Sequence, residues 1–233
     1  MSDSTSSAHG MDVTGYGYSQ DDLPELDHGP VDLRTWFGFD RDVADPDPQN
    51  AEFAARDRPM DLEIGSGRGT FLAQQAVLEP GVDFLGIEWA KQFWRHAADR
   101  ARRRELANVR LLWADATVFV RNYVGDQTLR HVHIYFPDPW PKKRHHKRRS
   151  VQAPFLRELH RVLHVGGEIR LATDHAEYFA WMQEHAAQVE DLFERRPFAP
   201  PASAGEGELV GTNFERKYIA EGRAFNAMVL AKR

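Results

Sequence analysis

The amino-acid sequence predicts an α/β protein built on a single doubly wound, mostly parallel sheet. Short apolar runs alternate with helical patterns from Met60 to the C-terminus, and a glycine-rich turn, Gly65 to Gly69, follows the first of these runs. Strands that alternate with helices at this rhythm pair in parallel in one layer. Several runs also end on an acidic residue. In such sheets ligands bind beyond the carboxyl ends of the strands, so these acids indicate a site.

The first strand, turn and helix are the best defined elements. Met60 to Ile64 reads as a buried strand, and Thr70 to Leu78 reads as the helix after the glycine turn. The glycines permit a tight turn and let a ligand approach the backbone. Val82 to Glu88 reads as a second strand, and Glu88 follows the turn by about 20 residues, the spacing at which a carboxylate reaches ribose hydroxyls.

The rest of the chain continues this alternation. Helices are expected at Trp89 to Glu105, Thr117 to Val124, Val151 to Leu163 and Tyr178 to Val189. Strands are expected at Val109 to Trp113, Val132 to Phe136, Glu168 to Ala172, Asp191 to Glu194 and Phe225 to Leu230. Gly166 and Gly167 are expected to end the third of these helices, and a Pro/Gly-rich loop is expected over 197–211.

Charge and composition divide the chain into three parts. Residues 1–58 hold 13 acidic residues and 4 arginines, whereas the remainder carries a net charge of +4. We expect a disordered acidic tail over 1–30, an extension over 31–58 that docks on the domain, and a catalytic domain over 59–233. The chain has no cysteine, which excludes disulfides, a thiolate nucleophile and a cysteine zinc site. No apolar run is long enough to span a membrane and no signal peptide is recognisable, so a cytoplasmic protein is expected.

The glycine turn itself indicates which cofactor is bound. Its pattern is Gly-x-Gly-x-Gly, with Glu63 two residues before the first glycine. A carboxylate at that position would repel a pyrophosphate but would attract the ammonium and sulfonium groups of S-adenosyl-L-methionine. A nicotinamide oxidoreductase is therefore the least favoured alternative. The structural alternative for Glu63 is an acid that caps the following helix.

The segment after the strand Val132 to Phe136 carries the strongest functional signal. Asp138 lies between two prolines and beside Trp140, and six Lys/Arg and two His follow within Lys142 to Arg149. Such a density of positive charge attracts a polyanion. The alternative is a solvated basic turn or a targeting-type run, but the position at a strand end favours a catalytic loop joined to a phosphate-binding loop. Trp140 could stack on a base or cover the core. We expect no metal at the two histidines, because no acids are spaced to complete a site.

These motifs together resemble the bacterial tRNA (guanine-N7-)-methyltransferases, from about Met60 to the C-terminus. The segments that carry the resemblance are Leu62 to Gly69, Gly86 to Glu88, Phe136 to Arg149, Ala172 to Asp174 and Thr212 to Glu215. The resemblance implies a Rossmann-like class I methyltransferase that transfers a methyl group from S-adenosyl-L-methionine to guanine N7 in the tRNA variable loop. One departure concerns the acidic tail, because the family often has a basic leader there.

The same resemblance implies roles for individual residues. The cofactor-binding residues would be Glu63, Gly65, Gly67, Glu88, Asp115 and Asp138. The substrate-binding residues would be Lys142, Asp174, Thr212, Asn213, Phe214 and Glu215. The RNA-contacting residues would be Arg144, His145, His146, Lys147, Arg148 and Arg149. Asp138 would also be the catalytic residue, and Glu215 would accept hydrogen bonds from the Watson–Crick edge of the guanine beneath a lid.

The expected chemistry needs no general base. Guanine N7 has an in-plane lone pair and no proton, so alignment with the S–CH3 bond is the main requirement. Asp138 would stabilise the positive charge that develops on the purine. Two alternatives remain open: a non-catalytic RNA-binding module on the same fold, and a methyltransferase for another substrate. We expect tRNA as the partner, no membrane, and a monomer, with a homodimer as the alternative.

Overall fold

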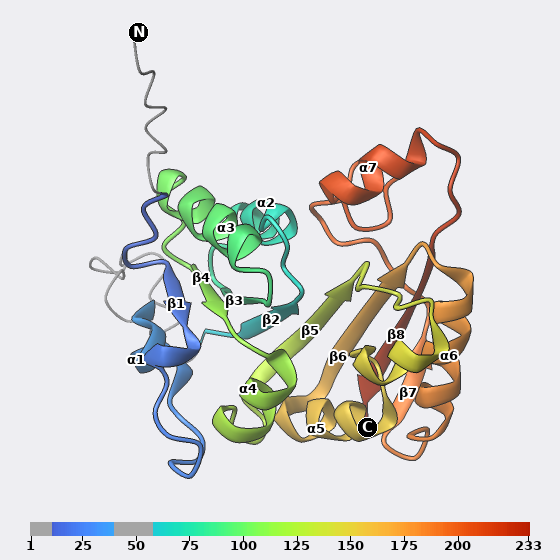
Figure 1. Cartoon of the computed structure of the whole chain (residues 1–233), viewed down its shortest axis with the longest axis horizontal. Coiled ribbons are helices and arrows are strands. Elements are labelled where there is room, and N and C mark those ends of the chain that lie inside the picture. The colour runs from blue at the N-terminus through green and yellow to red at the C-terminus, as the bar shows by residue number, and fades with distance from the viewer. Residues whose placement is uncertain (1–10, 40–57) are drawn as a thin grey trace, which may run out of the picture.

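The computed structural model describes residues 11–39 and 58–233 of the chain. Its centre is one sheet in the order β1-β4-β3-β2-β5-β6-β8-β7 (Figure 1). The strands are β1 Gly17–Ser19, β2 Met60–Ile64, β3 Asp83–Glu88, β4 Val109–Trp113, β5 Leu129–Tyr135, β6 Leu163–Thr173, β7 Phe193–Arg196 and β8 Asn226–Lys232. Strands β1 to β6 pair in parallel, and β8 runs antiparallel to both β6 and β7. The carboxyl ends of six strands therefore share one edge of the sheet.

Helices cover both faces of this sheet. They are α1 Leu33–Phe37, α2 Thr70–Leu78, α3 Lys91–Arg103, α4 Ala116–Tyr123, α5 Ala153–Val162, α6 Ala176–Ala187 and α7 Asn213–Ile219, with the short 3-10 helices η1 Gln20–Asp22 and η3 Lys143–Arg148. Leu85 and Ile87 of β3 belong to the apolar core shared with α4, α5 and α6, whereas Phe84 belongs to the core shared with α2 and α3. This alternation along one strand confirms the predicted doubly wound fold.

Most predicted elements are confirmed to within a few residues. Strands β2 and β4 and helix α2 have the predicted bounds. Gly86 lies where α2 packs closest to β3, because a Cβ there would lie 2.4 Å from the Cδ1 of Leu72. The close approach of α2 to the strand therefore requires a glycine in the middle of β3.

The expected disorder up to Pro30 is wrong for residues 11–30. Gly17–Ser19 forms the edge strand β1, and Leu111 of β4 donates its backbone N–H to the carbonyl of Tyr16 (2.8 Å). The Tyr18 hydroxyl donates to the carbonyl of Phe37 (2.7 Å). Composition does not detect this strand, because three residues of backbone pairing and a few side-chain contacts hold it in place. Residues 1–10 lie outside the described ranges.

The extension after Pro30 contacts the domain through α1. Leu33, Phe37 and Phe39 are buried, and Asp32 caps α1 by accepting from the backbone N–H groups of Arg34 and Thr35. These contacts attach the described part of the extension to the core under β4. The remainder, residues 40–57, lies outside the described ranges.

The glycine pair Gly166–Gly167 does not separate a helix from a strand as expected. Helix α5 ends at Val162, and β6 begins at once and includes both glycines. A Cβ on Gly167 would lie 2.6 Å from the carbonyl oxygen of Arg130, and the pairing with β5 shifts register between Leu129 and His131. Gly167 is thus needed for the close approach of two strands, whereas Gly166 has a φ angle of +76°. A glycine pair that ends a helix has the same appearance in the sequence.

Candidate active site

The glycine turn after β2 presents bare backbone to open space. Gly65 and Gly67 have φ angles of +76° and +54°, and a Cβ on either would meet no atom within 4 Å. The carboxylate of Glu88, at the end of β3, fixes the turn: its Oε2 accepts from the N–H of Gly67 (2.8 Å) and its Oε1 from the N–H of Ala90 (2.7 Å). Glu88 is half-buried, so its remaining lone pairs stay available to a ligand.

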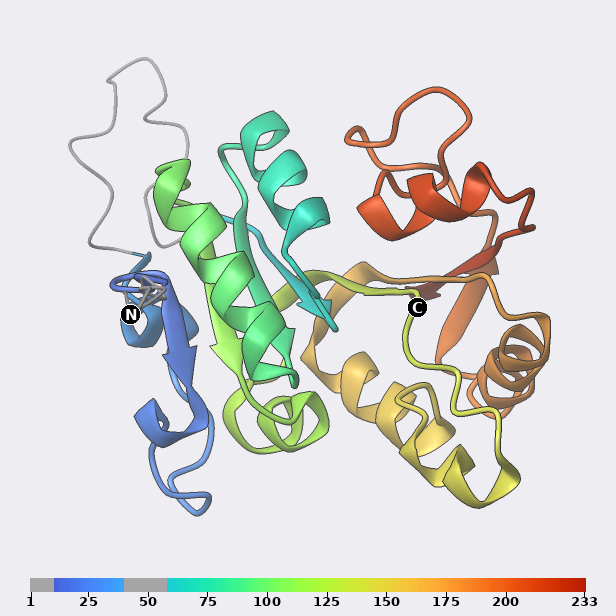
Figure 2. The same ribbon diagram turned by 45° about the horizontal axis from the view of Figure 1, so that its top comes forward.

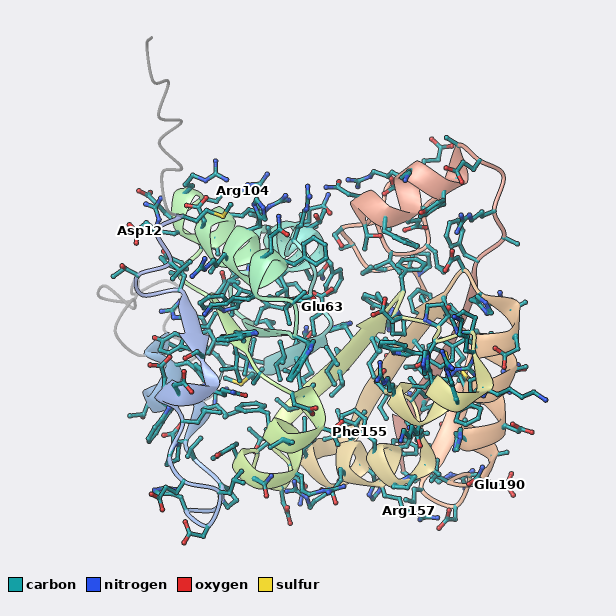
Figure 3. The ribbon with its side chains drawn as sticks, in the orientation of Figure 1. Asp12, Glu63, Arg104, Phe155, Arg157 and Glu190 are labelled. Carbon is teal, nitrogen blue, oxygen red and sulfur yellow. The ribbon has the colours of Figure 1, made fainter. Side chains whose placement is uncertain are left out.

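Glu63 lies beneath this turn with part of its carboxylate unpaired. It is 4% exposed, and within the described ranges neither its Oε2 nor the Oγ of Ser66 has a hydrogen-bond partner. Figure 3 shows Glu63 near the middle of the molecule, at the end of β2. Burial, followed by the nearby charge of Glu88, raises the pKa of Glu63 well above its ordinary value. Glu63 does not cap α2, whose N-cap is Gly69. Unpaired buried polar atoms beside open space are suited to a polar or cationic ligand.

Three further acids follow strands at the same edge of the sheet. Asp115 follows β4 and caps α4, because it accepts from the N–H groups of Thr117 (2.8 Å) and Val118 (3.0 Å). Asp174 follows β6 and forms an ion pair with Arg223 at 2.7 Å. Asp138 follows β5 and is exposed. The parallel pairing of β4, β3, β2, β5 and β6 brings all of these acids to one rim.

The loop that carries Asp138 has a strained backbone. Phe136 and Trp140 have positive φ angles, 50° and 44°, which cost a side-chain-bearing residue about 1–3 kcal/mol each. Arg149 contacts this loop from the buried side. Its Nε donates to the carbonyl of Pro139 (2.9 Å), and its guanidinium pairs with Glu177. Strain of this kind persists only where surrounding contacts impose it, which is common at functional sites.

Arg149 is therefore not an exposed RNA-contacting residue, contrary to expectation. It is 1% exposed, and its guanidinium lies 4.9 Å from the ring of Tyr178 and 5.0 Å from that of Trp181. A buried arginine that has these partners cannot reach a phosphate. The sequence did not reveal that Arg149 is buried, because its ion-pair and aromatic partners lie on α6, far along the chain.

The rest of the basic run forms the exposed turn η3. Lys142, Lys143, Arg144, Lys147 and Arg148 are all exposed, and the two histidines, His145 and His146, are half-buried. The Arg148 guanidinium lies 4.9 Å from the Trp140 ring, and the His145 ring meets the edge of Trp140 at 5.8 Å. Trp140 thus packs against the basic turn and belongs to neither apolar core, whereas its stacking on a base stays a prediction. No cluster of His, Asp and Glu in the described residues could hold a metal.

Helix α7 lies across the site from α2 and α3 (Figure 2). Thr212 caps it by accepting from the N–H of Glu215 (3.1 Å), with Asn213 exposed as its first residue. The Phe214 ring stacks on Phe136 with centroids 5.0 Å apart. The helix is thereby joined to the loop that carries Asp138.

Glu215 differs from its expected role at the guanine edge. It is fully buried, and its carboxylate accepts from the backbone N–H groups of Leu209, Val210 (2.9 Å) and Gly211 (2.8 Å). These bonds occupy its oxygens inside the loop before α7, so in this conformation the carboxylate cannot face a base. Glu215 instead holds the Pro/Gly-rich loop in shape.

A buried polar chain under the site was also missed. Asp61 of β2 accepts two hydrogen bonds from Arg130, each 2.8 Å, and one from His133 (3.0 Å), whose Nδ1 lies 2.8 Å from the hydroxyl of Tyr135. Burial alone would raise the pKa of Asp61, but the hydrogen bonds from Arg130 and His133 bring it well below its usual range. Polar residues at alternate positions of apolar strands, as at Asp61 and Glu63, were the available signal in the sequence.

Comparison with known proteins places the chain among methyltransferases. Residues 57–227 match a family described as "Putative methyltransferase". The chain is 38% identical over 200 residues to the tRNA (guanine-N(7)-)-methyltransferase of Alkalilimnicola ehrlichii, covering 84% of this chain and 82% of that protein. It is 36% identical over 211 residues to the enzyme of the same name from Halorhodospira halophila, covering 89% and 81%.

Solved structures support the same fold. The crystal structure of the aminoglycoside resistance methyltransferase NpmB1 superposes with a TM-score of 0.52 at 16% identity, covering 76% of this chain and 88% of that chain. At this identity the likeness concerns the fold alone. Among the described residues, no helix combines the length and the apolar character needed to cross a membrane.

Proposed function

The chain belongs to the tRNA (guanine-N(7)-)-methyltransferase family, and from this premise we propose that it transfers a methyl group from S-adenosyl-L-methionine to N7 of a guanine in the variable loop of tRNA. The observation that carries the proposal is the buried carboxylate of Glu63, whose Oε2 has no hydrogen-bond partner among the described residues, beside an open glycine turn on the sheet edge where Asp138 also lies. We expect the enzyme to act in the cytoplasm as a monomer.

The residues around the glycine turn fit this cofactor. S-adenosyl-L-methionine supplies an electrophilic methyl group on a positively charged sulfur. Among the described residues the Oε2 of Glu63 and the Oγ of Ser66 have no partner, and Gly65 and Gly67 leave room for a ligand against the backbone. Glu88 would accept from the ribose hydroxyls of the cofactor while it continues to hold the turn. Asp115, which caps α4, would lie beside the adenine of the cofactor.

The chain's contribution to catalysis is positioning and electrostatics. Asp138 is an exposed carboxylate fixed between two prolines, on a loop that Arg149 and α7 both hold. A carboxylate held in this way favours the positive charge that appears on the purine ring. Because guanine N7 has no proton to lose, no residue is needed as a general base. Lys142 and the exposed cations of η3 would bind the phosphates that flank the guanine.

A non-catalytic RNA-binding module remains the competing proposal. Such a module would have no reason to maintain a buried carboxylate at an energetic cost. The raised pKa of Glu63 shows that its charged form is unfavourable in the free protein. That cost is accounted for if a cationic ligand binds there.

The test is direct. The purified chain is incubated with unmodified tRNA and methyl-labelled S-adenosyl-L-methionine, and the nucleosides are then separated. We expect label in 7-methylguanosine, and mapping of the modified position should place it in the variable loop. Label in another nucleoside would point to a methyltransferase of different specificity. Tight tRNA binding without cofactor binding would support the non-catalytic module.

A further inference from the structure

A basic stripe runs from the glycine turn along helix α3, and the proposed function assigns no role to its side chains. The α3 stripe consists of Arg68, Phe93, Arg100 and Arg104. Phe93, Arg100 and Arg104 are separated by seven and four residues, so they lie on one face of the helix. The Arg68 guanidinium lies 5.8 Å from the Phe93 ring, and Arg100 donates to the hydroxyl of Thr70 at the start of α2 (3.3 Å). The stripe therefore starts in the glycine turn and follows α3 away from it.

The positive charge of this stripe is not balanced by the acids that the structure describes. The only acid in α3 is Asp99, which pairs with Arg102 and Arg103, each at 3.0 Å. In the described part of the chain, neither Arg68 nor Arg104 forms an ion pair, and both are exposed. Burial lowers the pKa of Arg100, and so do the positive charges of Arg104, Arg103 and Arg68. Like charges held this close destabilise the free protein, a cost that a bound polyanion would offset.

The residue types indicate which polyanion this is. Arginine forms planar, bidentate contacts with phosphates, and an exposed aromatic ring offers a surface on which an unstacked base can lie. Phe93 is 40% exposed and lies within the basic residues. From Phe93 to Arg104 the helix rises by about 16 Å, long enough to contact more than one phosphate. An acidic protein surface would have no comparable use for the ring.

The position of the stripe supports the same partner. Helix α3 lies on one side of the carboxyl edge of the sheet, and the loop from β5 that leads to η3 lies on the other (Figure 2). We propose that the α3 stripe is a second RNA-contacting surface, which binds the sugar–phosphate backbone of the tRNA on the opposite side of the site from η3. This inference rests on the proposed function and adds to it a second docking surface for the same substrate.

The test compares two triple variants with the same loss of charge. The stripe variant is Arg68→Gln, Arg100→Gln and Arg104→Gln, and the control is Arg121→Gln, Arg157→Gln and Arg195→Gln. The control residues lie on α4, α5 and β7, and Figure 3 shows Arg157 at the opposite end of the molecule from Arg104. Affinity for an unmodified tRNA transcript is measured over a range of salt concentrations, together with affinity for S-adenosyl-L-methionine.

We expect the stripe variant to bind tRNA more weakly, with the slope of log affinity against log salt reduced by about two units. The control should have the same slope as wild type. Cofactor affinity should be unchanged in the control and in the single variant Arg104→Gln, whose substitution lies outside the glycine turn. Phe93→Ala should weaken binding by a similar factor at every salt concentration, because stacking involves no ion release. If the stripe and control variants have the same slope as wild type, the surface does not contact RNA and the inference is wrong.

Folding and function are controlled separately. Thermal unfolding of the stripe variant should occur no lower than that of wild type, because mutual repulsion has been removed. If the triple variant does not fold, Arg104→Gln alone should still reduce the slope by about one unit, and an unchanged slope in that variant also overturns the inference. Failure of wild type to methylate tRNA would refute the proposed function. Normal methylation with an unchanged slope would refute only the stripe.

Discussion

Three glutamates of the site differ in what their carboxylates contact. Glu88 and Glu215 accept backbone N–H groups, so each maintains the shape of a loop. Glu63 is buried like Glu215, but within the described ranges its Oε2 has no partner. All three residues are glutamates in the sequence, and only their hydrogen-bond partners in the fold separate a carboxylate that shapes a loop from one that is available to a ligand.

Glu63→Gln should stabilise the free protein at neutral pH and weaken S-adenosyl-L-methionine binding. The pKa of Glu63 is raised above its ordinary value of 4.5, so the unfolded chain releases the proton first and the native state loses stability as pH rises above that value. The amide removes this loss. Thermal unfolding should show a higher midpoint for the variant at pH 8, with the difference shrinking towards pH 4.5. A midpoint at or below that of wild type at pH 8 would show that Glu63 has another partner.

Asp138→Asn should slow methyl transfer far more than it weakens tRNA binding. Under the proposed function the purine would become cationic beside this exposed carboxylate, and loss of one preorganised electrostatic group costs about a hundredfold in rate. Single-turnover methylation is the sensitive measurement, with tRNA affinity measured alongside. Asp191→Asn, at an exposed site before β7, serves as the control. Equal single-turnover rates for Asp138→Asn and wild type would remove the electrostatic role.

At the scale of elements, the loop after β5 is held from two sides. Arg149, which pairs with Glu177 of α6, donates a hydrogen bond to Pro139 in this loop, and Phe214 of α7 stacks on Phe136. The ion pair between Asp174 and Arg223 joins the end of β6 to the segment after α7. The proline-containing loop after β5 and the Pro/Gly-rich loop before α7 are therefore packed together over the carboxyl ends of the strands. Loss of the contacts that hold these loops should therefore lower kcat.

Arg149→Met should lower kcat by about 10- to 100-fold while the KM for tRNA changes little. Methionine retains packing against Tyr178 and Trp181 but loses the hydrogen bond to Pro139 that positions Asp138, and small misplacements have effects of this size. Because Arg149 is buried, the salt dependence of tRNA binding should not change.

The matched control for Arg149 is Glu177→Gln. It breaks the ion pair but leaves the bond to Pro139, and Glu177 is 54% exposed, so an effect close to zero is expected. A reduced salt slope in Arg149→Met would mean that Arg149 does contact phosphate. The positioning role assigned to it would then fail.

Glu215→Gln should loosen the loop before α7 and lower kcat/KM. Replacing the charge weakens three bonds from backbone N–H groups in a buried setting, a loss of about 1–3 kcal/mol. Hydrogen exchange of residues 205–219 should accelerate, whereas exchange in β2 and β3 should not. The control Glu206→Gln changes an exposed acid of the same loop. Unchanged exchange in Glu215→Gln would show that other contacts hold this loop.

At the scale of the whole molecule, the segment 11–39 covers one edge of the sheet. Strand β1 covers β4, Tyr123 donates its hydroxyl to the carbonyl of Pro24 (2.8 Å), and Trp36 donates its indole N–H to the carbonyl of Asp22 (3.1 Å). An acidic, glycine-containing segment thus becomes part of the fold through contacts with residues distant in sequence. An uncovered β4 would expose unpaired backbone groups at the edge.

Deletion of residues 1–30 should lower the melting temperature by at least about 5 °C relative to deletion of residues 1–10. The larger deletion removes β1 and the hydrogen bonds to Tyr123 and Trp36, and for a chain of this size 1 kcal/mol corresponds to about 2–4 °C. Thermal unfolding of the two truncated proteins provides the comparison. Equal midpoints would restore the expectation that this segment is disordered.

The sequence by itself determined the alternation of strands and helices, the parallel sheet and the rim of acids. These follow from local apolar periodicity and from the rule that parallel strands end at one edge, so neither needs knowledge of distant contacts. Glu63, Glu88, Asp115, Asp138 and Asp174 were all found in this way. The family motifs then identified the chemistry.

Only the tertiary structure decided what each charged residue contacts. Arg149 meets Glu177, 28 residues away, and Glu215 meets the backbone of its own loop, whereas Arg148 remains exposed. Burial favours hydrogen-bond partners that compensate for lost water, and those partners are set by packing between elements. The same physical reason explains β1. This strand is stabilised by pairing with β4, and the residues of β1 alone do not predict that pairing.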